Sequence, residues 1–197
     1  VSPVDDGPVL GNEIEDVTVN EDAADSNIDL ANVFNDVDDD NASITKTATS
    51  SDDSLVTASV SGDVLTLHFL ADQVGDANVT VTATSNGKTV TDSFEVTVTE
   101  VNDPPTSTTD DDIGVKNFTT TYSIADLLSN DSTGPANESN QQLSVSDVTT
   151  LTDQGGTLEL DGGVLRYTPP NPTFIGDDVL RYTITDNGTT NGASDPL

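Results

Sequence analysis

Apolar and polar side chains alternate at successive positions along this chain, and that alternation restricts the folds open to it. In residues 65–69, 79–83, 94–98 and 180–184 every second residue is apolar. A strand with one buried face has this period of two, whereas an amphipathic helix repeats every three to four residues. Thr and Val dominate these segments, as in strands, and Asp, Asn, Gly and Ser fill the turns between them. The sequence therefore predicts an all-β chain, with short helical turns only at 28–34 and 123–128.

A repeated junction gives the domain organisation. Residues 1–8 align with residues 98–105 at an offset of 97, with matching apolar, acidic and proline positions. A repeat of about 100 residues with closely spaced strands is typical of tandem β-sandwiches with Greek-key connections. We therefore expect the end of a preceding linker at 1–8, a sandwich at 9–99, a linker at 100–105 and a second sandwich at 106–197.

The predicted strands follow from the alternating segments. In the first sandwich they lie near 14–19, 43–49, 55–60, 63–70, 77–84 and 89–99. In the second they lie near 113–117, 120–125, 143–149, 156–160, 164–168 and 178–185. The second sandwich is expected to lack the final strand that the first has at 89–99. That truncation would leave an open sheet edge, which can pair with another chain.

Charge excludes several classes of partner. The chain has 36 Asp and Glu residues against 5 Lys and Arg, so its net charge is −31. Nucleic acids and anionic membrane surfaces attract clustered cations, so neither is an expected partner. No apolar run is long enough for direct membrane insertion. Cysteine is absent, which excludes disulfides, thiolate metal sites and thiol catalysis.

The acidic residues are mostly Asp, which accounts for 29 of the 36. Asp favours turns and hard-cation sites, because a short carboxylate lets neighbouring carbonyls reach the same ion. Asp36, Asp38 and Asp40 stand at i, i+2 and i+4, a spacing that lets a loop wrap one cation. An EF-hand is rejected, because Asn41 and Thr47 stand where that motif needs Gly and Glu. A solvated turn remains the alternative for this loop, as solubility does for the Asp excess.

The linker carries a more specific pattern. Glu100, Asn102 and Asp103 precede the paired prolines Pro104 and Pro105, which hold the backbone extended. Their side-chain oxygens are therefore expected to point outward in a fixed arc suited to a hard cation. Close carboxylates repel one another unless a cation neutralises them, so the junction is expected to be flexible without calcium and rigid with it.

This linker resembles that of cadherins and of the cadherin-like repeats in large bacterial surface adhesins of the RTX type. In that family an acid-x-Asn-Asp-x-Pro run clamps calcium between successive sandwiches. Residues 127–131, 156–158, 163–169 and 174–186 also resemble bacterial cadherin-like or Ig-like repeats, so the likeness covers nearly the whole chain. One position departs from the pattern: Ser85 replaces a ligand of the family's Ala-x-Asp motif, with Asn86 as its substitute.

The resemblance implies two sets of Ca²⁺ ligands. The central set comprises Glu21, Asp72, Glu100, Asn102 and Asp103 from the first domain and linker, and Asn130, Asp131 and Asp186 from the second. The set at the start of the chain comprises Asp5, Asp6, Asp36 and Asp38. Plain turn chemistry is the alternative for Asn130, Asp131 and Asp186.

The function expected from this resemblance is structural. The chain would be a calcium-rigidified extender of a secreted bacterial adhesin at the cell surface, supporting cell adhesion, with neighbouring repeats of the same chain as its partners. The alternative is a calcium-dependent module that binds polysaccharide or a cell-surface protein, including a like domain. Phosphate-binding loops and nucleophile elbows are absent, so no enzymatic activity is predicted.

Overall fold

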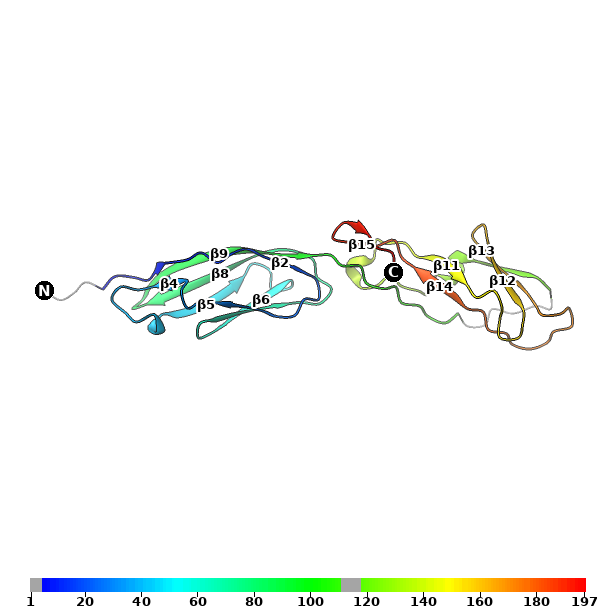
Figure 1. Ribbon diagram of the computed structural model, residues 1–197, viewed down its shortest axis with the longest axis horizontal. Coiled ribbons are helices and arrows are strands. Elements are labelled where there is room, and N and C mark those ends of the chain that lie inside the picture. The colour runs from blue at the N-terminus through cyan, green and yellow to red at the C-terminus, as the bar shows by residue number, and fades with distance from the viewer. Residues whose placement is uncertain (1–4, 111–117) are drawn as a thin grey trace. The chain divides into compact units, whose positions relative to one another are not determined.

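The computed structural model describes residues 5–110 and 118–197, and places the side chains of all of these except Ala42. The predicted strand at 113–117 lies outside the described residues. The chain divides into two compact units, with the boundary between Val101 and Asn102 (Figure 1). Each unit is built from strands, joined by turns and by short helices of three or four residues.

The first unit is a sandwich of two sheets. One sheet has the strand order β2-β9-β8-β5, formed by Val17–Asn20, Lys88–Thr99, Gly75–Ser85 and Thr45–Ser50. The other has the order β3-β7-β6, formed by Ser26–Asp29, Val64–Phe69 and Val56–Ser61. Strand β2 runs parallel to β9, while the other pairs within these sheets are antiparallel. A short pair, β1 (Val9–Leu10) with β4 (Phe34–Asn35), and the 3₁₀ turn η1 (Asn41–Ser43) complete the unit.

The alternation in sequence produces the core of this sandwich. In β7, Leu65, Leu67 and Phe69 are buried, and the residues between them face outward. The same pattern in β8 and β9 supplies buried residues from the opposite sheet, as expected when one face of each sheet packs inward. At the turn between these two strands, Asn86 and Gly87 have φ values of 48° and 80°. Two successive left-handed residues of this kind match the twist of a tight hairpin.

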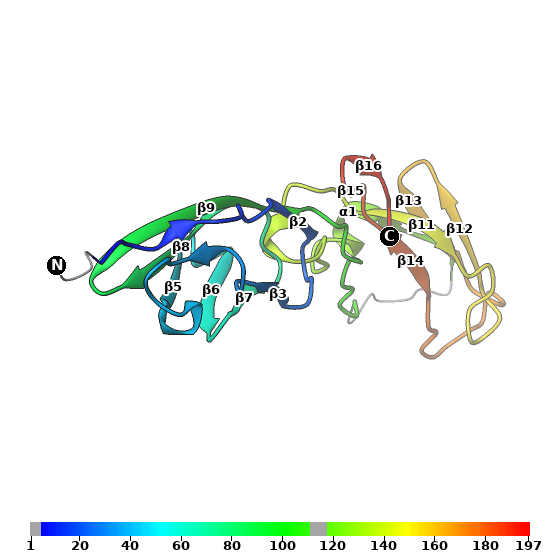
Figure 2. The ribbon, with the colours of Figure 1, turned by 60° about the vertical axis from the view of Figure 1, so that its left-hand side comes forward.

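The second unit has the same layered organisation with shorter strands (Figure 2). Its first sheet has the order β10-β13-β12, formed by Thr120–Ser123, Val164–Thr168 and Thr157–Asp161. A second pair joins β11 (Ser144–Val148) to β14 (Tyr182–Thr185), and a third joins β15 (Thr189–Thr190) to β16 (Ala193–Ser194). The helices are α1 (Ile124–Leu127) and the 3₁₀ turn η2 (Ala136–Glu138). The buried hydrophobic cluster here is small, consisting of Leu127, Leu158, Leu165 and Tyr167.

One element expected from the sequence is wrong. The predicted helical turn at 28–34 is instead the end of β3, a turn and the start of β4. Leu30, Val33 and Phe34 are all buried, so their spacing imitates the apolar stripe of a helix. They are buried because the turn between β3 and β4 packs against the core of the sandwich. The other predicted helical turn appears as α1.

Candidate metal-binding site

The predicted ligands fall into four groups, each described within its own unit. Two groups belong to the first unit, at its residues 5–6 and around Glu21. Two belong to the second, around Asn102 and around Asp131.

In the group at residues 5–6 of the first unit, other side chains of the protein contact the acidic residues. The Asn86 amide donates to Asp5 Oδ1 and to Asp39 Oδ2, each at 2.7 Å, and the Ser85 hydroxyl donates to the same Asp39 oxygen at 2.8 Å. The Lys88 ammonium lies 3.1 Å from Asp5 Oδ2 and also donates to the Asp5 carbonyl. This end of the unit thus carries the cationic side chain of Lys88 close to Asp5. Lys88 partly neutralises this end of the unit.

The loop at 36–40 is a folded turn organised by its own carboxylates. Asp36 Oδ1 accepts the backbone N–H of Asp38 at 3.0 Å and that of Asp39 at 3.3 Å. Asp38 Oδ2 accepts the backbone N–H of Asp6 at 2.7 Å, which ties residues 5–6 to the loop. Asp40 immediately precedes η1, as its N-cap residue. Asp36 Oδ2 is buried and has no hydrogen-bond partner within the described residues, so this turn retains one oxygen that a cation could use.

We expect Lys88→Gln to raise the pKa of Asp5 toward its ordinary value. The Asn86 amide is the main cause of the lowered Asp5 pKa and Lys88 adds to it, so the rise should be partial. A carboxyl whose pKa is depressed on folding stabilises the fold above its unfolded pKa, and this contribution is lost as pH falls through the folded pKa. Carboxyl-carbon NMR titration of Asp5 measures the change, with Lys88→Arg as the control that keeps the charge. An unchanged Asp5 pKa in Lys88→Gln would contradict the assigned contact.

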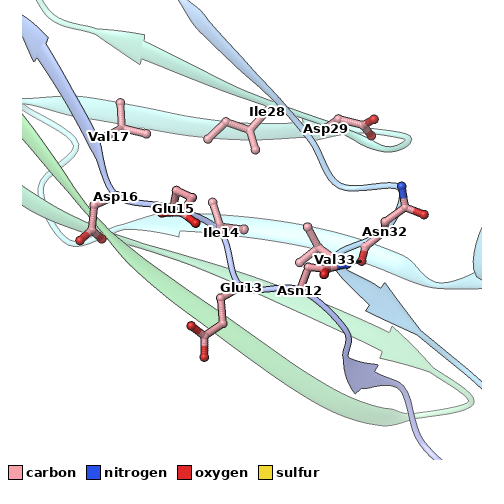
Figure 3. Close-up of a pocket in the computed structure, with 10 residues that line it drawn as sticks. All are labelled: Asn12, Glu13, Ile14, Glu15, Asp16, Val17, Ile28, Asp29, Asn32 and Val33. Atoms are coloured by element: carbon pink, nitrogen blue, oxygen red, sulfur yellow. Dashed lines mark hydrogen bonds between the residues drawn. The ribbon is translucent and has the colours of Figure 1, made fainter.

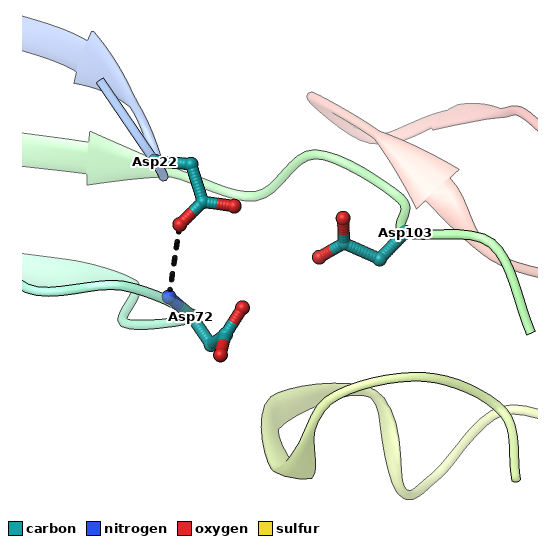
Figure 4. Close-up of side chains that lie close together, drawn as sticks. All are labelled: Asp22, Asp72 and Asp103. Carbon is teal, nitrogen blue, oxygen red and sulfur yellow. Dashed lines mark hydrogen bonds between the residues drawn. The ribbon is translucent and has the colours of Figure 1, made fainter. Parts of the chain in front are cut away.

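In the second group, around Glu21, the side chains organise the end of β9. Glu21 is buried, and its Oε1 accepts the backbone N–H of Val101 at 2.8 Å. Asp22 Oδ1 accepts the backbone N–H of Asp72 at 3.2 Å, and both residues have positive φ, 58° and 56° (Figure 4). Asp tolerates that conformation better than most residues. Asp103, the third residue drawn in Figure 4, belongs to the second unit.

Two positions in this group bear on the sequence prediction. Glu100 is half-buried and lies directly after β9, beside the Glu21 contact to Val101. Asp22 was not among the predicted ligands, although it shares the tight turn that follows β2 with Glu21. Its neighbour in sequence, Glu21, is the residue that matches the family pattern. The turn places Glu21 inward and leaves Asp22 exposed.

The third group is centred on Asn102, which is only 3% exposed. Its Nδ2 donates to Asp186 Oδ1 and to the Asp195 carbonyl, and its Oδ1 accepts from Gln141 Nε2, each at 2.8 Å. Its backbone N–H donates to Thr190 Oγ1 at 3.0 Å. The structure therefore brings two predicted ligands, Asn102 and Asp186, into direct contact.

Two buried acids flank Asn102. Asp186 Oδ1 also accepts the backbone N–H groups of Gly188 at 2.9 Å and Leu197 at 3.3 Å. Glu138, which sequence reasoning missed, is 1% exposed and accepts the backbone N–H of Asp103 at 2.8 Å. Burial raises the pKa of Glu138, and repulsion from Asp103 and Asp186 acts in the same direction. The group therefore concentrates negative charge away from solvent.

Two glycines make room for these side chains. A Cβ at Gly188 would lie 1.5 Å from Asn102 Oδ1, and a Cβ at Gly134 would lie 2.1 Å from Glu138 Oε2. Neither distance is compatible with any other residue type unless the amide or the carboxylate moves. The backbone thus approaches both oxygens closely.

The fourth group contains Asn130 and Asp131, and its contacts are with a different segment. Asp131 Oδ1 accepts the backbone N–H of Thr108 at 2.7 Å, and Asn130 Nδ2 donates to the carbonyls of Thr108 and Thr109 at 3.3 and 3.4 Å. These bonds join segments that are 21–23 residues apart, so they are long-range contacts and not the local side-chain-to-backbone bonds of a turn. None of these contacts involves Asn102 or Asp186.

A groove in the first unit, of about 370 Å³, is a further surface feature (Figure 3). Its floor is apolar, with Ile14, Val17, Ile28 and Val33, and acidic side chains surround it. None of its ten lining residues is a predicted metal ligand, and none is aromatic. The groove therefore offers no aromatic platform on which a sugar ring could stack.

A known sequence family matches the second unit. Residues 102–194 match the sequence model of the bacterial Ig domain family. Domains of that family are typically extracellular or surface-exposed structural modules. No protein of curated function matches the sequence. Among the described residues there is no helix with the length and apolarity needed to cross a membrane.

Several solved structures resemble the whole chain at low sequence identity. A protocadherin gamma B7 structure with extracellular cadherin domains 1–4 has a TM-score of 0.44 and 13% identity, covering 98% of this chain and 49% of that one. An endo-fucoidan hydrolase of glycoside hydrolase family 107 has a TM-score of 0.42 and 17% identity, covering 97% of this chain and 28% of that one. The structure of titin domains z1z2 in complex with telethonin has a TM-score of 0.39 and 10% identity, covering 98% of this chain and 94% of that one.

The chain thus spans about a quarter of the fucoidan hydrolase and half of the protocadherin structure. It is built of two units made mainly of strands, and residues 102–194, in the second unit, match the bacterial Ig domain family.

Proposed function

We propose that this chain is a structural module of a bacterial cell-surface adhesin, in which calcium stiffens the tandem of sandwiches. Its role would be mechanical: it extends a longer protein so that distant binding domains reach a surface. The match of the second unit to bacterial Ig domains and the high negative charge of the chain support this proposal. Repulsion among many carboxylates favours a flexible chain until a cation neutralises them.

The observation that carries the proposal is the way the linker is built into the second unit. Asn102 is buried, and it hydrogen-bonds Asp186 and Gln141 directly. The next residue, Asp103, has its backbone N–H fixed by Glu138. Any cation held by these oxygens would therefore fix the linker to the domain that follows it. A linker restrained in this way bends less, which is what an extender requires.

Calcium is the ion that fits these donors best. The donors are carboxylates and amide oxygens, which hard cations prefer, and the chain contains no cysteine. Calcium sites of extracellular modules have dissociation constants of about 10⁻⁴–10⁻³ M. With 10 mM calcium, one such site would stabilise the fold by about 1.4–2.7 kcal/mol. This range is large enough to measure by thermal unfolding.

Small-angle X-ray scattering in calcium and in chelator tests the proposal. We expect calcium to extend the particle and to narrow its distribution of dimensions, because neutralised linker carboxylates no longer repel. Asp103→Asn should lose most of this response, since it removes one linker carboxylate while keeping the side-chain shape. Asp53→Asn is the matched control, because Asp53 is exposed in a turn of the first unit.

The control should respond to calcium like the unaltered chain. Scattering curves that are identical in calcium and in chelator would overturn the stiffening role and leave the acidic residues as surface charge.

A further inference from the structure

The groove of the first unit lies where the chain passes from one strand pairing to another. Strand β1 pairs with β4, whereas β2 pairs with β9, and residues 11–16 cross between these two pairings. This crossing segment forms one side of the groove and β3 forms the other (Figure 3). Among the described residues β3 pairs with β7 alone. The crossing therefore leaves β3 as an edge strand beside the groove.

The backbone of β3 presents hydrogen-bonding groups to this free edge. The Leu30 N–H donates to the Asp63 carbonyl at 2.7 Å, in register with the antiparallel ladder between β3 and β7. In such a ladder alternate residues direct both backbone groups to the same neighbouring strand. Ile28 therefore bonds to β7, while Asn27 and Asp29 direct their N–H and C=O groups to the free edge. An added strand could bond these groups, as extended peptides do when they join a sheet edge.

The floor of the groove is apolar and incompletely covered. Ile14 and Val33 are 8% and 6% exposed, whereas Val17 and Ile28 are half-buried. All four belong to the core of the sandwich or pack against it. The side chains of an added strand would alternate between this floor and the solvent. A strand that fits here should therefore carry an apolar residue at every second position.

Every charged residue that lines the groove is acidic. These residues are exposed, and they are Glu13, Glu15, Asp16 and Asp29. Asp16 and Asp29 each accept one backbone N–H, at 2.8 and 2.9 Å. Within the described part of the chain, Glu13 and Glu15 take part in no hydrogen bond or ion pair. Acidic side chains beside a free edge repel a strand of like charge and attract one that carries Lys or Arg.

We propose that this groove binds an extended segment of another protein, in which apolar residues alternate with Lys or Arg, as a strand added beside β3. The apolar residues cover the floor, and the basic residues lie on the solvent side with the acidic rim. A second copy of this chain does not fit these requirements, because its net charge is −31. The proposal adds a protein partner to the mechanical role and needs no calcium, so the two can fail separately.

The first experiment uses the unaltered full chain and three six-residue probe peptides. In one Lys and Val alternate, in the second Glu and Val alternate, and the third has its Lys and Val residues in two blocks. The alternating Lys peptide should slow hydrogen exchange at the Asn27 and Asp29 N–H groups and leave Ile28 unchanged, because only the first two face the free edge. The other two peptides should bind more weakly. Equal binding of all three, or no change at these N–H groups, would overturn the proposal.

A second experiment blocks the edge itself. Asn27→Pro removes an N–H that faces the free edge and keeps the ladder with β7, because proline is tolerated where its missing donor faces solvent. We expect it to weaken binding of the alternating Lys peptide by about 10-fold or more. Asn27→Ala is the matched control, since it loses the same side chain but keeps the N–H. Equal affinity of the two variants, with the first unit folded in both by calorimetry, refutes strand addition.

A third experiment tests the acidic rim, and it decides the proposal if Asn27→Pro does not fold. Glu13→Gln combined with Glu15→Gln should weaken binding of the alternating Lys peptide by about 2- to 30-fold. Asp53→Asn combined with Glu159→Gln removes the same charge from exposed positions outside the groove and should bind like the unaltered chain. Equal affinity of the two double variants would contradict the role of the rim.

Sedimentation without peptide tests the competing occupant. We expect the chain to remain monomeric as its concentration rises, since its like charges repel. A dimer that slows exchange at the Asn27 and Asp29 N–H groups would instead assign the groove to a second copy and overturn the proposal.

Discussion

Leu67→Ala should lower the melting temperature of the first unit by about 12–24 °C without changing that of the second. Leu67 lies in the centre of β7 with no exposed surface, between the two sheets. Truncating a buried Leu costs about 2–5 kcal/mol, and about 3 kcal/mol corresponds to this shift in a domain of about 100 residues. Scanning calorimetry measures it, because two independent domains give two separable transitions.

Val64→Ala is the control for this prediction. Val64 belongs to the same strand but is 44% exposed, so its truncation leaves no cavity and should change the melting temperature little. A single transition that shifts as a whole in Leu67→Ala would contradict the independence of the units. The second unit has the smaller buried cluster, so we expect its transition at the lower temperature.

Most of the longer strands, and several short ones, were predictable from alternation. β5, β6, β7, β8 and β9 appear within two residues of their expected bounds, because each has one face buried against the opposite sheet. β10, β11, β12 and β13, of four or five residues, do so too, whereas β3 was missed because it has a single apolar residue, Ile28, and its pairing with β7 comes from the tertiary fold. The helical turn predicted at 28–34 is wrong for the same reason. Three residues of the segment that runs from β3 into β4 are buried by tertiary packing, and their spacing resembles that of a helix.

The candidate site was predictable only where residues stand in a motif. Asn102 and Asp186 came from the resemblance, and the structure joins them by a hydrogen bond. Glu138 lies in a polar loop whose sequence has no periodicity, and its neighbour in space, Asp103, is 35 residues away. The only local signal was Gly134-Pro135, which marks a turn before it. The contacts of Asn130 and Asp131 with residues 108–109 are also long-range, so no local pattern indicated them.

Asn102→Ala should destabilise the second unit by about 3 kcal/mol, which corresponds to about 12–24 °C in its melting temperature. The substitution removes three side-chain hydrogen bonds, of which one is to the ionised group of Asp186. It also leaves Gln141 and the Asp195 carbonyl without their partner in a buried position. Hydrogen bonds to charged groups are worth about 1.5–3 kcal/mol and neutral ones about 1, so the three bonds add to about 3.5–5 kcal/mol. Rearrangement of the freed partners lowers the net loss to about 3 kcal/mol. Calorimetry in chelator measures it without any contribution from calcium.

Asn140→Ala provides the matched comparison, because Asn140 is an exposed residue of the loop between η2 and β11. Its melting temperature should stay close to that of the unaltered chain. If Asn102→Ala behaves in the same way, the linker is not anchored by its amide. The anchoring argument for stiffening then fails with it, because a cation held by Glu138 and Asp186 would no longer restrain the linker through Asn102. The alternative result is that Asn102→Ala lowers the melting temperature in chelator and that calcium then raises it by less than it raises that of the unaltered chain. In that case the amide both supports the second unit and couples ion binding to the linker.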